Sequence, residues 1–235
     1  MSIVVYAMDV STLDPGLKSW SRWVDAPRLA AAAQLRRRED QALAVGAGLL
    51  LLYAVRHVRP GQPLPLDVKT ASGGKPFLPA LPDFHFSISH SGMWAVCAVS
   101  GHPVGVDIEQ VANNMHEVAR RMFSPAEQEV LLALPGAERS AAACESWVLK
   151  ESYMKATGLG FQLPMERLSL RLGPTPILLQ DSRPVGGTVA LCPFPDAAYR
   201  LALADSQSDS SMGKVRIIGW EALLGHLTES AVRPE

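Results

Sequence analysis

Two stretches of sequence, which together decide the expected fold and site, read Gly105-Val106-Asp107-Ile108-Glu109 and Trp147-Val148-Leu149-Lys150-Glu151-Ser152-Tyr153-Met154-Lys155. The first predicts a short strand over residues 104–108, and side chains two apart on a strand share a face. Asp107 and Glu109 should therefore project together. On a helix, residues four apart share a face, so Glu151 and Lys155 should do the same. We expect these three carboxylates and the lysine to meet at one Mg²⁺, which keeps water or phosphate oxygens as its other ligands.

Length, composition, net charge and cysteine content limit the classes of protein to which this chain can belong. The chain has 235 residues, of which 48% are apolar and 19% charged, so one large or two small ordered domains are expected. A net charge of −1 argues against a dedicated nucleic-acid binder. Cys97, Cys144 and Cys192 are widely spaced and odd in number, which indicates neither a disulfide framework nor a zinc site and fits the reducing cytoplasm.

No membrane segment is expected. Residues 1–8 carry no basic leader and no cleavage site, so they are interpreted as a first strand and not as a signal peptide. The longest apolar run, residues 43–55, is too short to span a bilayer and is typical of a buried helix.

The expected elements follow the order strand, helices, strands, and this order occurs twice along the chain. We expect strands over residues 3–8, 84–89, 94–100, 104–108, 168–172, 188–192, 199–204 and 215–218, and helices over 26–58 (with a break near 36–40), 114–122, 124–134, 140–157 and 220–227. Asp25 and Ser124 are expected caps, and Gly158 a helix end. The natural architecture is α+β, with antiparallel sheets and helices in two halves, residues 1–102 and 103–235, and the active site in the cleft between them.

At this point the motifs resemble those of a known family, the 4′-phosphopantetheinyl transferases. The residues that carry the resemblance are G-V-D-I-E at 105–109, W-x-x-K-E-S-x-x-K at 147–155, F-H-F-S-I-S-H-S-G at 84–92 and G-K-P at 74–76, in the family's order and spacing. The similarity runs from about residue 34 to 172, includes Arg38-Glu39-Asp40 and Phe123-Ser124, and is to the large, pseudo-dimeric, surfactin-synthetase-activating type.

The resemblance implies both a fold and an activity. Two similar halves, related by a pseudo-twofold axis, would hold coenzyme A between them. The protein would move the phosphopantetheine arm of coenzyme A to a serine hydroxyl of an acyl or peptidyl carrier protein and release adenosine 3′,5′-bisphosphate. Because the two halves supply both sides of the site, a monomer is expected.

The resemblance also implies roles for the acidic residues and for Lys155. Asp107, Glu109 and Glu151 would bind Mg²⁺, with Mn²⁺ as an alternative. Glu151 would take the proton from the carrier serine, directly or through water, and Lys155 would contact the phosphates. The plainer interpretations are a solvated strand edge for Asp107 and Glu109, and an exposed helical Glu–Lys pair for Glu151 and Lys155.

Cofactor binding would fall to residues on other segments. The resemblance places Ser89 and His90 at the phosphates, Lys75 at the nucleotide end and Arg28 at the 3′-phosphate, although Ala31 stands where close relatives carry a second basic residue. A structural histidine and an ordinary loop lysine are the alternatives. A Ser-His hydrolase pair is rejected, because adjacent strand residues point to opposite faces.

Other questions stay open at this stage. Lys150 is expected either to touch phosphate or to be solvated, and residues 36–38 either to compensate for Ala31 or to form a solvated face. Residues 115–123, with Arg120, Arg121, Met122 and Phe123, are expected to form a carrier docking surface, and the alternative is that Met122 and Phe123 belong to the core. A binding module without turnover and a metal-dependent phosphodiester hydrolase are competing hypotheses, and the physiological carrier cannot be identified.

Overall fold

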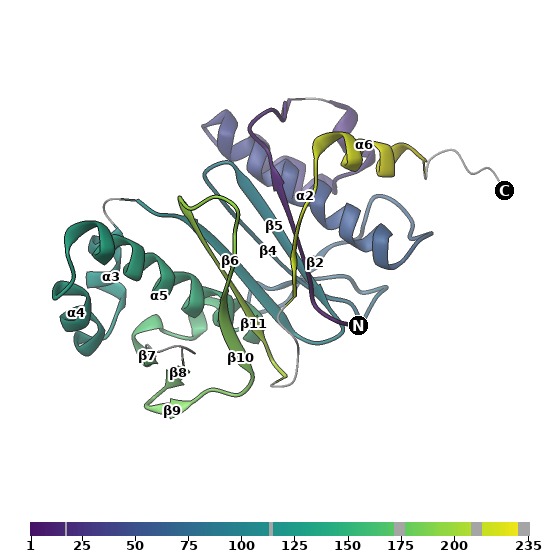
Figure 1. The fold of residues 1–235 in the computed structure, drawn as a ribbon. Coiled ribbons are helices and arrows are strands. Elements are labelled where there is room, and N and C mark those ends of the chain that lie inside the picture. Colours follow the sequence, from purple (N-terminus) through teal and green to yellow (C-terminus); the bar gives the residue numbers. More distant parts are fainter. Residues whose placement is uncertain (17, 113–114, 172–176, 208–212, 230–235) are drawn as a thin grey trace.

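The computed structural model describes the whole chain except residues 17, 113–114, 172–176, 208–212 and 230–235. It is an α+β protein with several mostly antiparallel sheets (Figure 1). The strands are β1 Val4–Asp9, β2 Lys69–Thr70, β3 Pro76–Phe77, β4 His85–Ser91, β5 Trp94–Ser100, β6 Val104–Gln110, β7 Leu168–Arg171, β8 Ile177–Gln180, β9 Arg183–Pro184, β10 Thr188–Cys192, β11 Tyr199–Asp205 and β12 Val215–Ile217. The helices are α1 Ala26–Ala33, α2 Arg38–Val58, α3 Met115–Met122, α4 Pro125–Leu132, α5 Gly136–Thr157 and α6 Trp220–Glu229, with short 3₁₀ turns at Lys18–Arg22, Gly160–Gln162 and Met165–Arg167.

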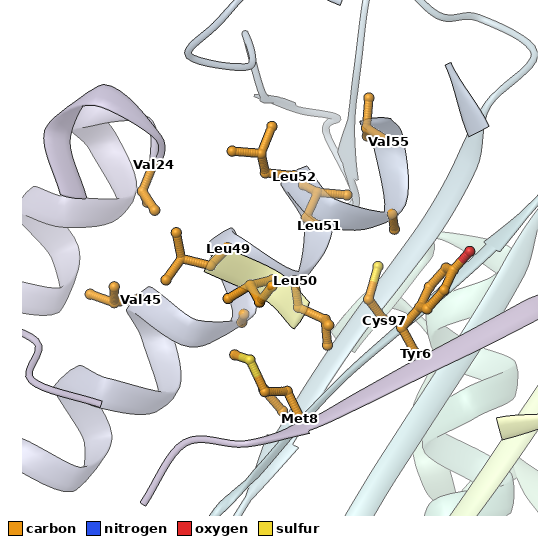
Figure 2. Packing of buried hydrophobic residues seen from close by; sticks show 14 of the residues in the cluster. Tyr6, Met8, Val24, Val45, Leu49, Leu50, Leu51, Leu52, Val55 and Cys97 are labelled. Carbon is orange, nitrogen blue, oxygen red and sulfur yellow. The ribbon is translucent and has the colours of Figure 1, made fainter. Parts of the chain in front are cut away.

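The first large sheet has the strand order β12-β1-β5-β4. Side chains alternate along β1, so Tyr6 and Met8 pack into the core beneath α2 while Val5 and Ala7 face the opposite side. Figure 2 shows Tyr6 and Met8 of β1 beside the leucines of α2. This helix is long and apolar enough to cross a membrane, but 72% of its most apolar window is buried inside the fold. It is a core helix, as the sequence predicted.

The second large sheet has the order β10-β11-β6 and is covered by α5. Ala202 and Ala204 of β11 face α5, whereas Leu201 and Leu203 face the other way. Those outward leucines meet Val5 and its neighbours in a third apolar cluster that joins the two sheets. The layers are therefore α2, first sheet, second sheet and α5.

The two sheets share a connectivity. In the first, β1 leads through α2 to β4 and then to β5, which pairs antiparallel with both. In the second, β6 leads through α5 to β10 and then to β11, which again pairs antiparallel with both. Both units bring strands far apart in the sequence side by side.

The predicted helix boundaries follow from capping chemistry. The carboxylate of Asp25 accepts the backbone N–H of Arg28 and begins α1, and α2 starts after a break at residues 34–37. Ser124 and Glu127 form a reciprocal capping box at α4. Gly158, with a φ of 71°, ends α5 in the left-handed conformation that glycine adopts without strain.

Two features of the fold were not predicted. β12 pairs in parallel with β1 and α6 packs on α2, so this C-terminal segment lies with the first sheet. Leu223 and Leu227 of α6 are fully buried in that core. The division into halves at residues 1–102 and 103–235 stays a prediction. The predictions also omitted the β2–β3 pair and the strands β8 and β9, which are two to four residues long.

Candidate active site

A cavity of about 430 Å³ lies where β4, β6 and α5 meet. Its lining comes from both sheets and comprises Arg28, Pro76, Ile88, Ser89, His90, Asp107, Glu109, Trp147, Glu151 and Lys155. Every acidic residue predicted for the metal site, and every predicted cofactor-binding residue except Lys75, is therefore in one place.

The backbone of β6 explains why two acids face this cavity. Val104, Val106 and Ile108 point into the cluster between the sheets, so Asp107 and Glu109 point toward α5. Gly105 shares that face, and a Cβ there would lie 1.8 Å from the carbonyl oxygen of Ser152. A glycine is needed for α5 to lie close enough to bring its own acid to the cavity.

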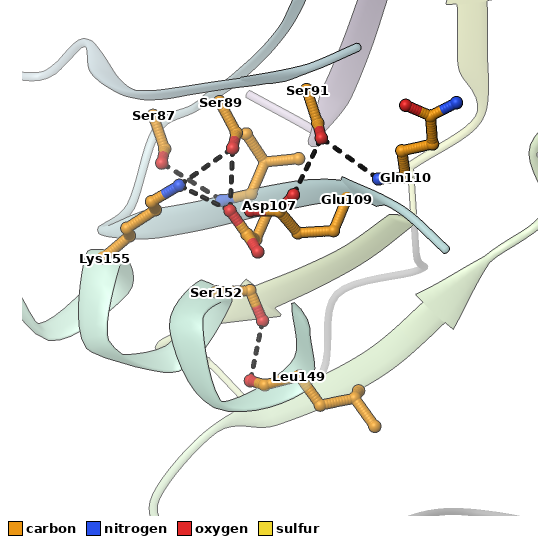
Figure 3. A network of polar contacts seen from close by, with 10 residues as sticks. Ser87, Ser89, Ser91, Asp107, Glu109, Gln110, Leu149, Ser152 and Lys155 are labelled. Atoms are coloured by element: carbon orange, nitrogen blue, oxygen red, sulfur yellow. Dashed lines mark hydrogen bonds and ion pairs between the residues drawn. The ribbon is translucent and has the colours of Figure 1, made fainter. Parts of the chain in front are cut away.

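Asp107 is the most buried acid of the site, at 2% exposure. Its Oδ1 accepts hydrogen bonds from the ammonium of Lys155 (2.6 Å) and the hydroxyl of Ser89 (2.7 Å), and Lys155 also donates to that hydroxyl (2.9 Å). Figure 3 shows both side chains converging on Asp107. Oδ2 is buried and has no hydrogen-bond partner among the described residues, so one carboxylate oxygen is available for a ligand.

Glu109 and Glu151 complete the acidic cluster. The hydroxyl of Ser91 donates to Oε2 of Glu109 at 2.7 Å. Burial raises the pKa of Glu109 to about 7, a shift that Asp107 and Glu151 reinforce and that Ser91 and Lys155 oppose. Burial, and then the charge of Asp107, also raise the pKa of Glu151. A carboxylate with a raised pKa is suited to proton transfer near neutrality.

The donor set fits a hard divalent cation in its chemistry. Three carboxylates share one cavity, burial and then the charges of their acidic neighbours raise the pKa of two of them, and Asp107 keeps an unpartnered oxygen. The ligands are not converged, however: among the described residues no three acidic, histidine or cysteine side chains stand close enough to hold a metal as they are. The ammonium of Lys155 is the cation that contacts Asp107 here.

Besides Lys155 of α5, the basic residues of the cavity come from α1 and β4. Arg28 is half-buried, and its Nε lies 3.7 Å from the carboxylate of Asp25. His90 is exposed at the rim. Arg37 and Arg38 are more than 70% exposed, pair with Glu39 and Asp14, and do not line this cavity.

Lys75 has contacts that the sequence did not indicate. Its ammonium donates to the carbonyl oxygens of Val104 (3.0 Å), Lys155 (2.7 Å) and Ala156 (2.9 Å). All three donors are thus used, and the side chain ties its loop to β6 and to the end of α5. A contact between the Lys75 ammonium and coenzyme A stays a prediction.

A second pocket, of about 400 Å³, adjoins the first and shares four lining residues with it. Its lining comprises Gly73, Gly74, Lys75, Pro76, Phe86, Ser87, Ile88, Glu151, Met154, Lys155, Gly158 and Gly160. The loop at 73–76 packs closely on the end of α5, since a Cβ on Gly73 would lie 1.9 Å from the carbonyl oxygen of Gly158. The pair of pockets offers a polar compartment next to a more apolar one.

Both interpretations of Lys150 were wrong. Its side chain is fully buried on the far side of α5, where the ammonium donates to Glu127 at 2.8 Å and lies 4.1 Å from the ring centre of Phe123. Phe123 is accordingly core, whereas Arg120 and Arg121 are exposed. Lys150 holds the start of α4 against α5.

The sequence interpretation also missed Ser91, although the signal was present. Ser87, Ser89 and Ser91 alternate along β4, which is the spacing of one strand face, and all three contact β6. Trp147 was quoted in a motif but given no role, and it lines the cavity one helical turn before Glu151.

Carboxylates, a lysine, an arginine and a histidine around one cavity are the composition of a site for a phosphate ester and its cation. The sequence profile of the 4′-phosphopantetheinyl transferase superfamily matches residues 103–202. The 4′-phosphopantetheinyl transferase psf-1 of Bacillus pumilus is 34% identical over 164 residues, which are 68% of this chain and 68% of that protein.

Two further relatives agree. The 4′-phosphopantetheinyl transferase HetI of Nostoc sp. is 32% identical over 68% of this chain and 69% of its own length. The 4′-phosphopantetheinyl transferase Sfp of Bacillus subtilis is 43% identical over 48% of this chain, and the chain spans about half (52%) of that relative. A Bacillus anthracis holo-(acyl-carrier-protein) synthase structure aligns with 43% of the chain at 20% identity, with a TM-score of only 0.36. The chain belongs to the 4′-phosphopantetheinyl transferase superfamily.

Proposed function

We propose that this protein transfers the 4′-phosphopantetheine arm of coenzyme A to a serine hydroxyl of an apo acyl or peptidyl carrier protein. The observation that carries the proposal is the single cavity that Asp107, Glu109, Glu151 and Lys155 line together. The names of the relatives support the same reaction. Phosphoryl transfer depends mostly on positioning and charge neutralisation, and this cavity provides groups for both.

In this proposal Asp107, Glu109 and Glu151 hold Mg²⁺, or Mn²⁺ in its place. Three points support them as ligands: the shared cavity, the free Oδ2 of Asp107 and the raised pKa of Glu109. When bound, the cation supplies neutralisation of the pyrophosphate charge.

The side chains then divide the remaining work. Lys155, Arg28, His90 and Ser89 bind and orient phosphate oxygens, and Lys155 is already held in position by Asp107. Glu151 accepts the proton of the carrier serine hydroxyl. The serine oxygen bonds to the phosphorus that bears the pantetheine arm, and the bond from that phosphorus to adenosine 3′,5′-bisphosphate breaks. The raised pKa of Glu151 supports its part.

The nucleotide end of coenzyme A is assigned to the second pocket, beside the loop that carries Lys75. Arg28 is assigned to the 3′-phosphate, without the second basic residue that Ala31 replaces. The contacts of Lys75 with three carbonyl oxygens favour recognition by the loop backbone, with the lysine as its anchor.

The architecture of the molecule is interpreted as two halves with pseudo-twofold symmetry. The shared connectivity of the two sheets supports this, with residues 215–229 moved to the first half and the second half starting at residue 103. Because one chain supplies both sides of the cavity, we propose a monomer. The three cysteines are free and buried, which fits the reducing cytoplasm.

The test is incubation of the protein with coenzyme A, Mg²⁺ and a panel of apo carriers, followed by intact-mass spectrometry. We expect each accepted carrier to gain one phosphopantetheine arm while adenosine 3′,5′-bisphosphate appears, and a carrier with its serine replaced by alanine to gain nothing. Release of free phosphopantetheine without carrier would instead identify a hydrolase. Tight coenzyme A binding with no product from any carrier would identify a binding module.

A further inference from the structure

The two sheets meet at β4 and β6, and serine side chains join these strands. The ladders pair β4 with β5 and β6 with β11, so the other edge of β6 faces β4. Ser87 and Ser91 of β4 face that edge, and their hydroxyl oxygens accept the backbone N–H groups of Val106 (3.1 Å) and Gln110 (3.0 Å) of β6. The serine hydroxyls thus accept the backbone N–H groups on this edge of β6, which in a larger sheet would pair with the carbonyl groups of a neighbouring strand.

The same row of hydroxyls contacts two of the acids. Ser89 donates to Oδ1 of Asp107 and Ser91 donates to Oε2 of Glu109, both at 2.7 Å (Figure 3). Each serine therefore engages one oxygen of one carboxylate. For Asp107 the other oxygen is the buried atom that has no partner among the described residues.

Glu109 needs such a restraint more than Asp107 does. Asp107 is held by both Ser89 and Lys155, whereas among the described residues only the hydroxyl of Ser91 donates a hydrogen bond to the carboxylate of Glu109. Glu109 has one more rotatable bond, and the charges of Asp107 and Glu151 repel it. Without a restraint, a flexible carboxylate in this surrounding would turn toward solvent.

We propose that Ser91 is a positioning residue for the cation site. By holding Oε2 of Glu109 it commits that oxygen to the protein and leaves the other oxygen as the one that would bind a divalent cation. This assignment rests on the cation site of the proposed function and deepens it. Partners that orient a metal ligand typically contribute about 10- to 100-fold to metal affinity.

The experiment measures Mn²⁺ binding to the full-length protein with saturating coenzyme A and no carrier, by the electron paramagnetic resonance signal of free Mn²⁺. We expect Ser91→Ala to weaken Mn²⁺ binding by about tenfold or more, and Ser91→Thr, which keeps the hydroxyl, to stay within about twofold of wild type. In the transfer assay, raising Mg²⁺ should restore most of the kcat of Ser91→Ala.

Ser100 provides a matched control. It is a buried serine on β5 whose hydroxyl oxygen accepts the backbone N–H of His102 at 3.1 Å, and it does not line the cavity. Ser100→Ala should lower the urea midpoint without changing Mn²⁺ affinity, which separates a loss of stability from a loss of positioning.

Two outcomes would overturn the assignment: a folded Ser91→Ala protein with wild-type Mn²⁺ affinity, or a wild-type protein that binds no Mn²⁺ in the presence of coenzyme A. The assay contains no carrier, so it does not depend on turnover. Mn²⁺ binding with the expected Ser91 dependence but no transfer to any carrier would support Ser91 and overturn the proposed function.

Discussion

Lys150 and Lys155 lie five positions apart on α5 and have opposite environments. Lys155 reaches the cavity and pairs with Asp107, whereas Lys150 is fully buried with Glu127 and the ring of Phe123. About 140° of helical rotation separates them, at about 100° per residue, so one helix serves the site with one lysine and the core with the other.

The burial of Lys150 predicts a structural phenotype. Lys150→Met removes one partner of a buried ion pair and leaves the carboxylate of Glu127 with fewer donors, so the free energy of unfolding should fall by about 3 kcal/mol or more. Urea denaturation measures this. The KM for coenzyme A should change little at a temperature where the variant is folded. A large rise in KM with unchanged stability would show that Lys150 binds the cofactor after all.

Glu109 makes the stability of the metal-free protein depend on pH. Its folded pKa of about 7 lies above the ordinary value of 4.5, so between these values the folded state binds more protons than the unfolded state. The free energy of unfolding contributed by Glu109 should therefore fall as pH rises through this window, by up to about 3 kcal/mol.

Urea denaturation in the presence of EDTA at pH 5 and pH 7 measures that change. Glu109→Gln does not titrate, so its stability should fall less than that of wild type over the same interval. Identical pH dependence in the two proteins would mean that the environment of Glu109 does not favour its protonated form.

At the scale of elements, the approach of α5 to β6 is decisive, because each element brings acids that the other lacks. Gly105→Ala places a Cβ 1.8 Å from a carbonyl oxygen of α5 and 2.5 Å from the backbone nitrogen of Ala156, and backbone atoms cannot give way as a flexible side chain does. We expect α5 to be displaced, stability to fall by about 2 kcal/mol or more, and transfer to be largely lost.

Gly136→Ala is the matched control, since a Cβ at this first residue of α5 meets nothing within 4 Å. Its unfolding free energy should stay within about 1 kcal/mol of wild type, and its activity should be unchanged. Equal behaviour of the two variants in denaturation and transfer assays would rule out close packing at Gly105 as the determinant.

At the scale of the whole molecule, local patterns predicted most elements but not every pairing. The alternating residues of β4, the apolar run of β5 and the caps at Asp25, Ser124 and Gly158 are local signals, and the strands and helices they predicted are present. The return of β12 to β1 was not predictable from periodicity, because a short strand carries no record of its partner.

The candidate site followed the same rule. The spacing of side chains on β6 and on α5 predicted which of them share a face. The family resemblance predicted that the two elements lie next to each other, and both line the cavity. The partners of the lysines could not be predicted. Lys75 ends on three carbonyl oxygens and Lys150 on a buried carboxylate, contacts that depend on tertiary packing and not on the neighbouring sequence.

The most direct test of the central claim is whether a cation held by these acids lies against the pyrophosphate of coenzyme A. Phosphorus NMR of coenzyme A with substoichiometric Mn²⁺ and the protein reports this proximity through paramagnetic broadening. With the wild-type protein we predict strong broadening of the pyrophosphate resonances. With Asp107→Asn the broadening should fall to the level that Mn²⁺ and coenzyme A give without protein. Equal broadening with wild type and the variant would contradict the account, as would no enhancement by wild type.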